Sequence, residues 1–184
     1  MTFRVTPAQL IDILHATPAN LPERVLKTPA AGITTDTRSL KPGDVFLALR
    51  GENFDGHEFV SQAIEKGAIA AVVERQLPVP VPQLQVKDTL QAYQAIAGWW
   101  REQFAIPVIA VTGSFGKTTT KELIAAVLGT HGKVLKTQQN YNNEIGVPKT
   151  LLELSSDHDF AVIEMAMRGS GQIALLTQIA RPTI

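Results

Sequence analysis

The stretch AVTGSFGKTTTKEL, residues 110–123, places a glycine-framed loop between an apolar run and a helical pattern. The apolar run IPVIAV (106–111) predicts a buried strand, and TTTKELIAAVLGTHG (118–132) predicts a helix closed by glycines. A strand, a tight loop and a helix, in this order, form the cradle in which many proteins hold phosphate. A structural turn between a strand and a helix is the alternative.

The residue types in the loop favour phosphate binding. Gly113 and Gly116 let the backbone turn tightly and bring its N–H groups close to phosphate oxygens, beside the free donors of the helix start. Lys117 would reach the β- and γ-phosphates, and Thr118 would place its hydroxyl on Mg²⁺. A structural turn has no use for Lys117, because a cation opposes the helix dipole there by about 0.3–1 kcal/mol. The loop departs from the common pattern at Val111, where that pattern has glycine. The predicted ATP-binding residues are Thr112, Gly113, Ser114, Phe115, Gly116, Lys117, Thr118 and Thr119.

Helical and extended patterns alternate along the whole chain, which predicts an α/β fold with a parallel, doubly wound sheet. Thr89 and Ser170 are the expected N-caps of two of the helices. Trp99 and Trp100 are expected to pack in a core or an interface. The predicted helices are 7–15, 57–67, 89–104, 118–132, 147–154 and 170–179, and the predicted strands are 32–37, 44–50, 68–73, 106–112, 133–137 and 160–166.

The segment ERQLPVPVPQLQV, residues 74–86, is the clearest candidate for a domain boundary in the chain. Its prolines recur at every second position, which prevents a helix and favours an extended, partly stiff segment. We therefore expect a small N-terminal α/β domain over residues 1–82 and a parallel-sheet P-loop domain over residues 83–184. An extended surface loop within a single domain is the alternative.

Composition excludes several classes of protein. The 184 residues include 17 lysines and arginines and 17 aspartates and glutamates, so no overall field favours nucleic acid or an anionic membrane. There is no cysteine, which removes disulfides and thiolate chemistry. No apolar run approaches the ~20 residues of a membrane helix. We expect a soluble, cytoplasmic protein that holds any anion by local geometry.

Candidate site residues follow other predicted strands of the same sheet. Glu164 ends the strand 160–166, where a carboxylate can share Mg²⁺ with Thr118 and phosphate oxygens; an exposed glutamate at a strand end is the alternative. Asn142 and Asn143 can offer amide groups to a pyrophosphate or a sugar, but asparagines also populate turns. Lys121 is expected to be solvated rather than catalytic.

In the N-terminal half, structural interpretations compete with functional ones. Asp36 and Arg38 are expected to form a surface ion pair worth under about 1 kcal/mol. Asp55 is a candidate helix cap. His57 stands alone and is not expected to be a catalytic base, and no histidine shows metal-ligand spacing.

Three segments together resemble the Mur ligases. TGSFGKTT (112–119) is similar to the ATP loop of that family and of folylpolyglutamate synthetase. ITTDTRSLKPGDVFLALRGENFDGHEFVSQAIEKGA (33–68) resembles the UDP-binding domain of the tripeptide- and dipeptide-adding members. NYNNEIGVPKTLLEL (140–154) is nearest to the member that adds the terminal dipeptide. The segments occur in the order of the family, and this combination is more specific than any single one.

The resemblance implies an ATP-driven amide ligation in peptidoglycan precursor synthesis, with ATP and Mg²⁺ as cofactors. The carboxylate of UDP-MurNAc-tripeptide would attack the γ-phosphate, and the amine of D-alanyl-D-alanine (D-Ala-D-Ala) would displace phosphate from the acyl phosphate. It implies catalytic roles for Lys117 and Glu164, Mg²⁺ ligation by Thr118 and Glu164, and a monomer with no nucleic-acid or membrane partner. The substrate-binding residues that it implies are Thr37, Arg38, Asn53, Asn142 and Asn143.

The chain ends at IARPTI (179–184), where members of the family continue through the ATPase domain and into a third domain. We therefore expect a truncated ligase, with a UDP-MurNAc-peptide-binding domain and the first part of the ATP-binding domain, that is inactive by itself. One alternative is a non-catalytic nucleotide- or UDP-sugar-binding module. Another is a different Mur-type ligase, such as the tripeptide-forming sibling.

Overall fold

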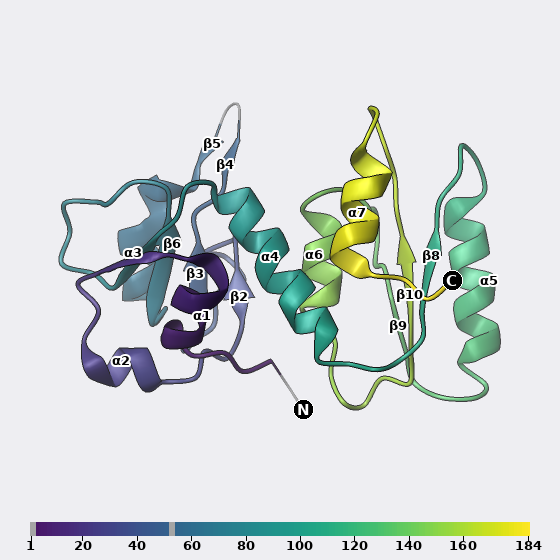
Figure 1. The fold of residues 1–184 in the computed structure, drawn as a ribbon, viewed down its shortest axis with the longest axis horizontal. Coiled ribbons are helices and arrows are strands. Elements are labelled where there is room, and N and C mark those ends of the chain that lie inside the picture. Colours follow the sequence, from purple (N-terminus) through teal and green to yellow (C-terminus); the bar gives the residue numbers. More distant parts are fainter. Residues whose placement is uncertain (1–2, 52–53) are drawn as a thin grey trace. The chain divides into compact units, whose positions relative to one another are not determined.

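Short, buried apolar runs form the central strands of one mainly parallel and one parallel sheet in the computed structural model, which describes residues 3–51 and 54–184 (Figure 1). The chain divides into two compact units between Ile96 and Ala97, within helix α4 (Thr89–Glu102). This division lies later in the chain than the predicted boundary after residue 82, because strand β7 (Gln83–Gln85) belongs to the sheet of the N-terminal unit.

The sheet of the N-terminal unit has the strand order β1-β7-β6-β3-β2. Strand β1 pairs antiparallel with β7, and all the other pairs are parallel. β3 (Val45–Leu47) and β6 (Ala70–Val73) are buried at every position, which explains their continuous apolar sequences. The remaining elements are β1 (Thr17–Ala19), β2 (Ile33–Thr34), the antiparallel pair β4 (Arg50–Gly51) and β5 (Phe54–Asp55), α1 (Pro7–Leu14), α2 (Glu23–Lys27), the 3₁₀-helix η1 (Gly56–Phe59) and α3 (Val60–Glu65).

The proline-rich segment is a closed loop of the N-terminal unit. The buried side chain of Gln83 accepts a hydrogen bond from Leu77 N–H at 2.8 Å and donates to Leu77 O at 3.1 Å. The same amide lies 3.3 Å from Val79 O and 3.4 Å from Val81 O. The segment is therefore an extended loop within a domain, the alternative considered above, followed by a strand of the same sheet.

The C-terminal unit contains a parallel sheet in the order β8-β10-β9. Helix α5 lies on one side of this sheet, and α6 and α7 lie on the other (Figure 1). The predicted doubly wound parallel α/β class is thereby confirmed for this unit. Its elements are β8 (Val108–Val111), α5 (Lys117–Leu128), β9 (Val134–Lys136), α6 (Gly146–Leu151), β10 (Phe160–Glu164) and α7 (Gln172–Ala180).

The C-terminal part of α4 packs in the core of this unit. Trp100 is fully buried, donates from Nε1 to Leu154 O at 3.0 Å and meets Phe104 edge-on. The predicted packing role of Trp100 is confirmed. In the described part of the chain, every helix is too short or too polar to cross a membrane.

Both predicted helix caps are wrong by one residue. Asp88 caps α4, because its carboxylate accepts from Gln91 N–H at 2.9 Å, whereas Thr89 turns inward and donates to Glu74 Oε1. Helix α7 follows Gly171, which has a left-handed φ of 84° and makes no side-chain cap.

Candidate nucleotide-binding site

The loop between β8 and α5 presents free main-chain donors to solvent. Gly116 precedes the helix with a φ of 75°, and Gly113 has a φ of 147°, so both occupy conformations that favour glycine. No side chain caps α5. Within residues 3–51 and 54–184, none of the main-chain N–H groups of residues 113–119 donates to a protein acceptor. Such a row of exposed N–H groups at a helix start attracts an anion.

Lys117 adds a positive charge to these donors. Its ammonium group donates to Gly113 O at 2.7 Å, and in the described structure it forms no ion pair with a carboxylate. A cation that opposes the helix dipole and has only a carbonyl for a partner is available to a negatively charged ligand.

Three of the predicted site residues meet at the carboxyl end of β10. Glu164 is 2 % exposed, accepts from Thr118 Oγ1 at 3.0 Å and accepts from Asn142 Nδ2 at 2.8 Å. Its main-chain N–H donates to the buried hydroxyl of Thr137 at 2.9 Å. The alternative of an exposed strand-end glutamate is therefore wrong, because Glu164 lies in a polar cluster beside the start of α5.

The oxygen atoms of this cluster are suitable ligands for a hard divalent cation. Thr118 and Glu164 offer a hydroxyl and a carboxylate, which are oxygen ligands of the kind that Mg²⁺ accepts together with phosphate oxygens and water. In the part of the chain that the structure describes, no group of three or more His, Cys, Asp or Glu residues gathers to hold a metal. The protein alone thus supplies an incomplete ligand set, which phosphate oxygens would complete.

The loop that carries Asn142 is held in place by α6. Asn143 Oδ1 accepts from the N–H groups of Ile145 and Gly146, at 3.2 and 2.8 Å, so this side chain serves the turn that sequence reasoning gave as its alternative. Gly146 is required here, because a Cβ would lie 2.4 Å from Tyr141 Cα. Lys149 covers the Tyr141 ring at 4.0 Å.

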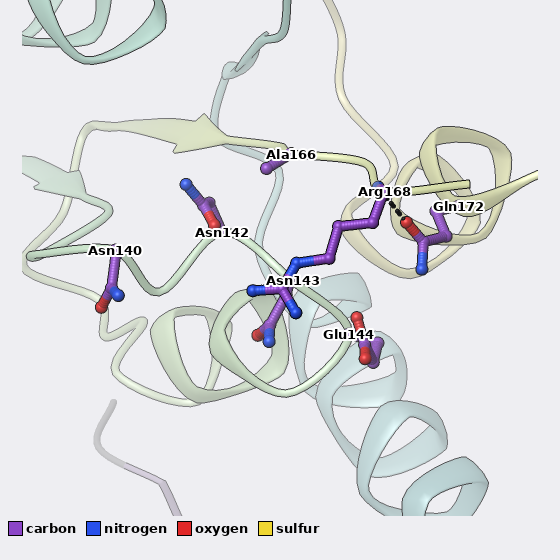
Figure 2. Close-up of a pocket in the computed structure, with 7 residues that line it drawn as sticks. All are labelled: Asn140, Asn142, Asn143, Glu144, Ala166, Arg168 and Gln172. Carbon is purple, nitrogen blue, oxygen red and sulfur yellow. Dashed lines mark hydrogen bonds between the residues drawn. The ribbon is translucent and has the colours of Figure 1, made fainter. Parts of the chain in front are cut away.

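A small polar cavity of about 110 Å³ opens beside this loop (Figure 2). Arg168, which follows β10, extends its side chain into the cavity toward the loop of Asn143 (Figure 2). Sequence reasoning missed Arg168, although its position just after a strand of the predicted sheet was an available signal. The lining residues are Asn140, Asn142, Asn143, Glu144, Ala166, Arg168 and Gln172.

Lys121 was expected to be solvated, and this expectation is wrong. Its side chain is 2 % exposed, and its Nζ donates to Thr137 O at 2.8 Å and lies 3.9 Å from Glu164 Oε2. Lys121 lies four residues after Lys117 and shares that face of the helix, but this spacing by itself does not indicate burial.

Two candidate residues of the N-terminal unit, Thr37 and Arg38, lie in the turn that follows β2. Arg38 is 89 % exposed at its side chain and forms the expected ion pair with Asp36 at 2.7 Å. Thr37 donates to Gln62 Oε1 at 3.0 Å. Asn53 lies outside the described residues.

Asp55 and His57 form a structural pair in that unit. Asp55 caps η1, as predicted, by accepting from His57 N–H. The His57 ring is buried, with Nδ1 at 2.6 Å from Asp55 and Nε2 accepting from Glu74 N–H at 2.8 Å. Both ring nitrogens are thus engaged, which agrees with the expectation that His57 is not a catalytic base.

The strand-loop-helix order, the free loop donors and the cluster at Glu164 have the arrangement of a P-loop, and comparison with known proteins identifies the family. The catalytic-domain model of the Mur ligase family matches residues 29–99, and the Mur ligase middle-domain model matches residues 111–184. The chain therefore belongs to the Mur ligase family.

The relatives described next are named as the ligase that adds D-alanyl-D-alanine, or by its short name MurF. UDP-N-acetylmuramoyl-tripeptide–D-alanyl-D-alanine ligase of Synechocystis sp. is 68% identical over 155 residues, which are 83% of this chain and 34% of the relative. The crystal structure of MurF from Acinetobacter baumannii matches 97% of this chain and 39% of its own, with a TM-score of 0.91 and 39% identity. MurF of Thermotoga maritima, solved in complex with ADP, matches 82% of this chain and 35% of its own, with a TM-score of 0.76 and 35% identity. The chain thus spans between a third and two fifths of the length of these relatives.

Proposed function

We propose that the chain is the substrate- and ATP-binding part of a ligase that joins D-alanyl-D-alanine to UDP-MurNAc-tripeptide in peptidoglycan precursor synthesis. The observation that carries this proposal is the row of N–H donors at residues 113–119 that lack an acceptor in the described residues; beside them, Lys117 bonds to the Gly113 carbonyl and to no described carboxylate. The names of the Synechocystis and Thermotoga relatives, and the ADP of the latter, support it.

In the proposed reaction, a carboxylate oxygen of the tripeptide bonds to the γ-phosphorus while the bond to ADP breaks. The amine of the dipeptide then bonds to the acyl carbon, loses a proton and releases phosphate. The protein must bring two anions together, so its task is positioning and charge neutralisation rather than covalent participation.

The residues divide this task between them. The amides of residues 113–119 and the ammonium group of Lys117 bind the phosphate oxygens. Thr118 and Glu164 hold Mg²⁺, and Asn142 orients the Glu164 carboxylate through its hydrogen bond of 2.8 Å. Bound Mg²⁺ would draw negative charge away from the γ-phosphate.

The remaining roles follow from the same proposal. Asn143 and the loops of Thr37, Arg38 and Asn53 would contact the UDP-MurNAc-tripeptide. The ligase would act as a monomer in the cytoplasm on small molecules, which agrees with a chain that has no cysteine and no net charge.

Nucleotide affinity of the Lys117→Ala variant tests the site. We expect the affinity for ATP to fall by about tenfold or more, because a charge-assisted hydrogen bond to phosphate is lost. The fold should persist, since Lys117 bonds only to the loop carbonyl of Gly113. Calorimetric titration measures the affinity, and circular dichroism checks the fold.

Lys133→Ala is the matched control for this test. Lys133 is an exposed lysine of the same unit whose ammonium pairs with Asp157, so its loss should leave ATP binding unchanged. Equal affinities for the wild type and for Lys117→Ala would contradict the assignment.

Phosphate release separates the ligase from a non-catalytic binding module. The chain is mixed with the remaining C-terminal part of the Synechocystis relative, and release is measured with ATP, UDP-MurNAc-tripeptide and D-Ala-D-Ala. The ligase requires all three substrates for turnover. A module that binds ATP without any release in this mixture would favour the alternative. Release with a single amino acid in place of the dipeptide would favour the tripeptide-forming sibling.

A further inference from the structure

Lys121 places a buried positive charge beside the two protein ligands that we assign to Mg²⁺. Its ammonium group donates to Thr137 O at 2.8 Å, lies 3.1 Å from Glu122 Oε1 and lies 3.9 Å from Glu164 Oε2. Lys136 pairs with the same Glu122. Two ammonium groups and two carboxylates therefore balance each other in this cluster.

Both oxygens of the Glu164 carboxylate have partners within the protein. It accepts from Thr118 on one oxygen and from Asn142 on the other, and Lys121 neutralises its charge. A cation that binds between Thr118 and Glu164 must displace the hydroxyl hydrogen bond and approach the ammonium group. At separations near 4 Å and intermediate dielectric, the repulsion between two cations is enough to weaken binding by about tenfold or more.

We propose that Lys121 makes divalent-cation binding at Thr118 and Glu164 conditional on the nucleotide. The inference rests on the proposed function, and assigns Lys121 a positioning role in it. Without a bound phosphate, the charges of the two lysines and two glutamates cancel, so the cluster has no net negative charge to attract a cation. A triphosphate on the loop donors brings several negative charges and the missing oxygen ligands, so the cation enters as a complex with nucleotide. Lys121 thereby keeps Glu164 oriented and the site closed to free cations.

Titration with Mn²⁺ tests this proposal, because Mn²⁺ takes the same oxygen ligands as Mg²⁺ and its free form is visible by electron paramagnetic resonance. The wild-type chain alone should bind Mn²⁺ only weakly. Lys121→Met should bind Mn²⁺ without nucleotide about tenfold more tightly or better, because the repelling charge is gone. A second readout is the affinity for a non-hydrolysable ATP analogue with and without Mn²⁺, which should rise with Mn²⁺ in the wild type.

Two control variants separate charge from structure. Lys121→Arg keeps the charge and should retain the weak Mn²⁺ binding of the wild type. Lys136→Met removes an ammonium group that pairs with Glu122 but does not face Glu164, so it should raise the Mn²⁺ affinity less than Lys121→Met does. A merely structural role for Lys121 predicts no gain of Mn²⁺ affinity in any variant.

Several outcomes overturn the proposal. One is a wild-type chain that binds Mn²⁺ equally well with and without the analogue, and this comparison needs no variant to fold. Another is a folded Lys121→Met variant whose Mn²⁺ titration matches wild type. If the analogue binds but does not change the affinity for Mn²⁺, only this inference fails. If the analogue does not bind, the proposed function fails as well.

Discussion

In the proposed site, Thr118 would have different roles with and without a bound cation. In the structure, its hydroxyl donates to Glu164 at 3.0 Å, whereas a hydroxyl that ligates a cation must present its oxygen lone pair. One rotation of this side chain would therefore exchange a protein hydrogen bond for a bond to the cation. Glu164 is the residue that both arrangements share.

Glu164→Gln should reduce magnesium dependence more than nucleotide affinity. The amide preserves the size of the side chain but removes the charge that holds the cation, so Mg²⁺ should no longer raise the affinity for ADP appreciably. Affinity for ADP without Mg²⁺ should stay within about threefold of wild type, since the loop donors are unchanged. Titration of ADP at several Mg²⁺ concentrations measures both quantities.

The matched substitution is Glu153→Gln, which neutralises an exposed carboxylate just beyond α6. It should leave the magnesium titration as in the wild type. A Glu164→Gln variant with an unchanged Mg²⁺ requirement would remove Glu164 from the metal site.

At the level of residues, sequence reasoning identified candidates whose side chains suit a phosphate or a cation and which lie at or just after the ends of predicted strands. Thr118 and Glu164 were predicted to lie together because the carboxyl ends of parallel strands share one edge of the sheet. The burial of Lys121 was not predictable from its own helix, because the main chain that covers it comes from Thr137, after another strand. The roles of these residues in binding stay predictions.

At the scale of elements, Asp55 joins the 3₁₀-helix η1 to the end of β6. Burial by itself raises the pKa of Asp55, but hydrogen bonds from His57 N–H, Arg75 and the His57 ring hold that pKa well below its usual value. His57 in turn accepts from the main chain of Glu74. One carboxylate thus anchors both a helix start and a strand end.

Asp55→Asn should destabilise the N-terminal unit in a pH-dependent way. At pH 7 we expect a loss of about 1–3 kcal/mol, because the asparagine can cap η1 but cannot pair with Arg75. The folded-state pKa is lowered, so the carboxylate stabilises the protein above about pH 4 and this contribution fades as the pH falls further. Urea unfolding at pH 7, 5 and 3.5 measures the difference between variant and wild type.

The exposed Asp12 on α1 provides the control, since Asp12→Asn should leave stability unchanged at every pH. A constant difference between Asp55→Asn and wild type from pH 7 to pH 3.5 would contradict the assigned charge effect.

The predicted elements were those with long apolar patterns. Central strands such as β6 and β10, and helices such as α4 and α5, bury one face or more and so carry a readable period. Strands β1 and β7 were missed, because Thr17–Ala19 and Gln83–Gln85 are only three residues long, show no clear apolar pattern and owe their structure to pairing with neighbours.

At the scale of the whole molecule, each unit encloses its own buried clusters. One cluster of the N-terminal unit is built around Phe46 and Val73, and one of the C-terminal unit is built around Val111 and Val162. We therefore expect a core substitution to act mainly on the unit that contains it.

Trp100→Ala should destabilise the C-terminal unit by about 3–5 kcal/mol, the range for truncating a buried large aromatic residue. It also leaves the carbonyl of Leu154 without its hydrogen bond. Hydrogen exchange measured by mass spectrometry should rise across residues 97–184 and change less across residues 3–88. Trp99→Ala, at the partly exposed neighbour, should give a smaller increase; a uniform increase in both units would contradict separate cores.

The hydrogen bonds of Gln83 determine which substitutions the proline-rich loop should tolerate. A single side-chain amide closes the proline-rich loop at its base, through Leu77, Val79 and Val81. Residues at the tip of that loop are then free to vary among descendants of this sequence, while exchange of Gln83 would open the whole turn at once. We therefore expect substitutions to be tolerated at the exposed side chains of this loop and not at Gln83.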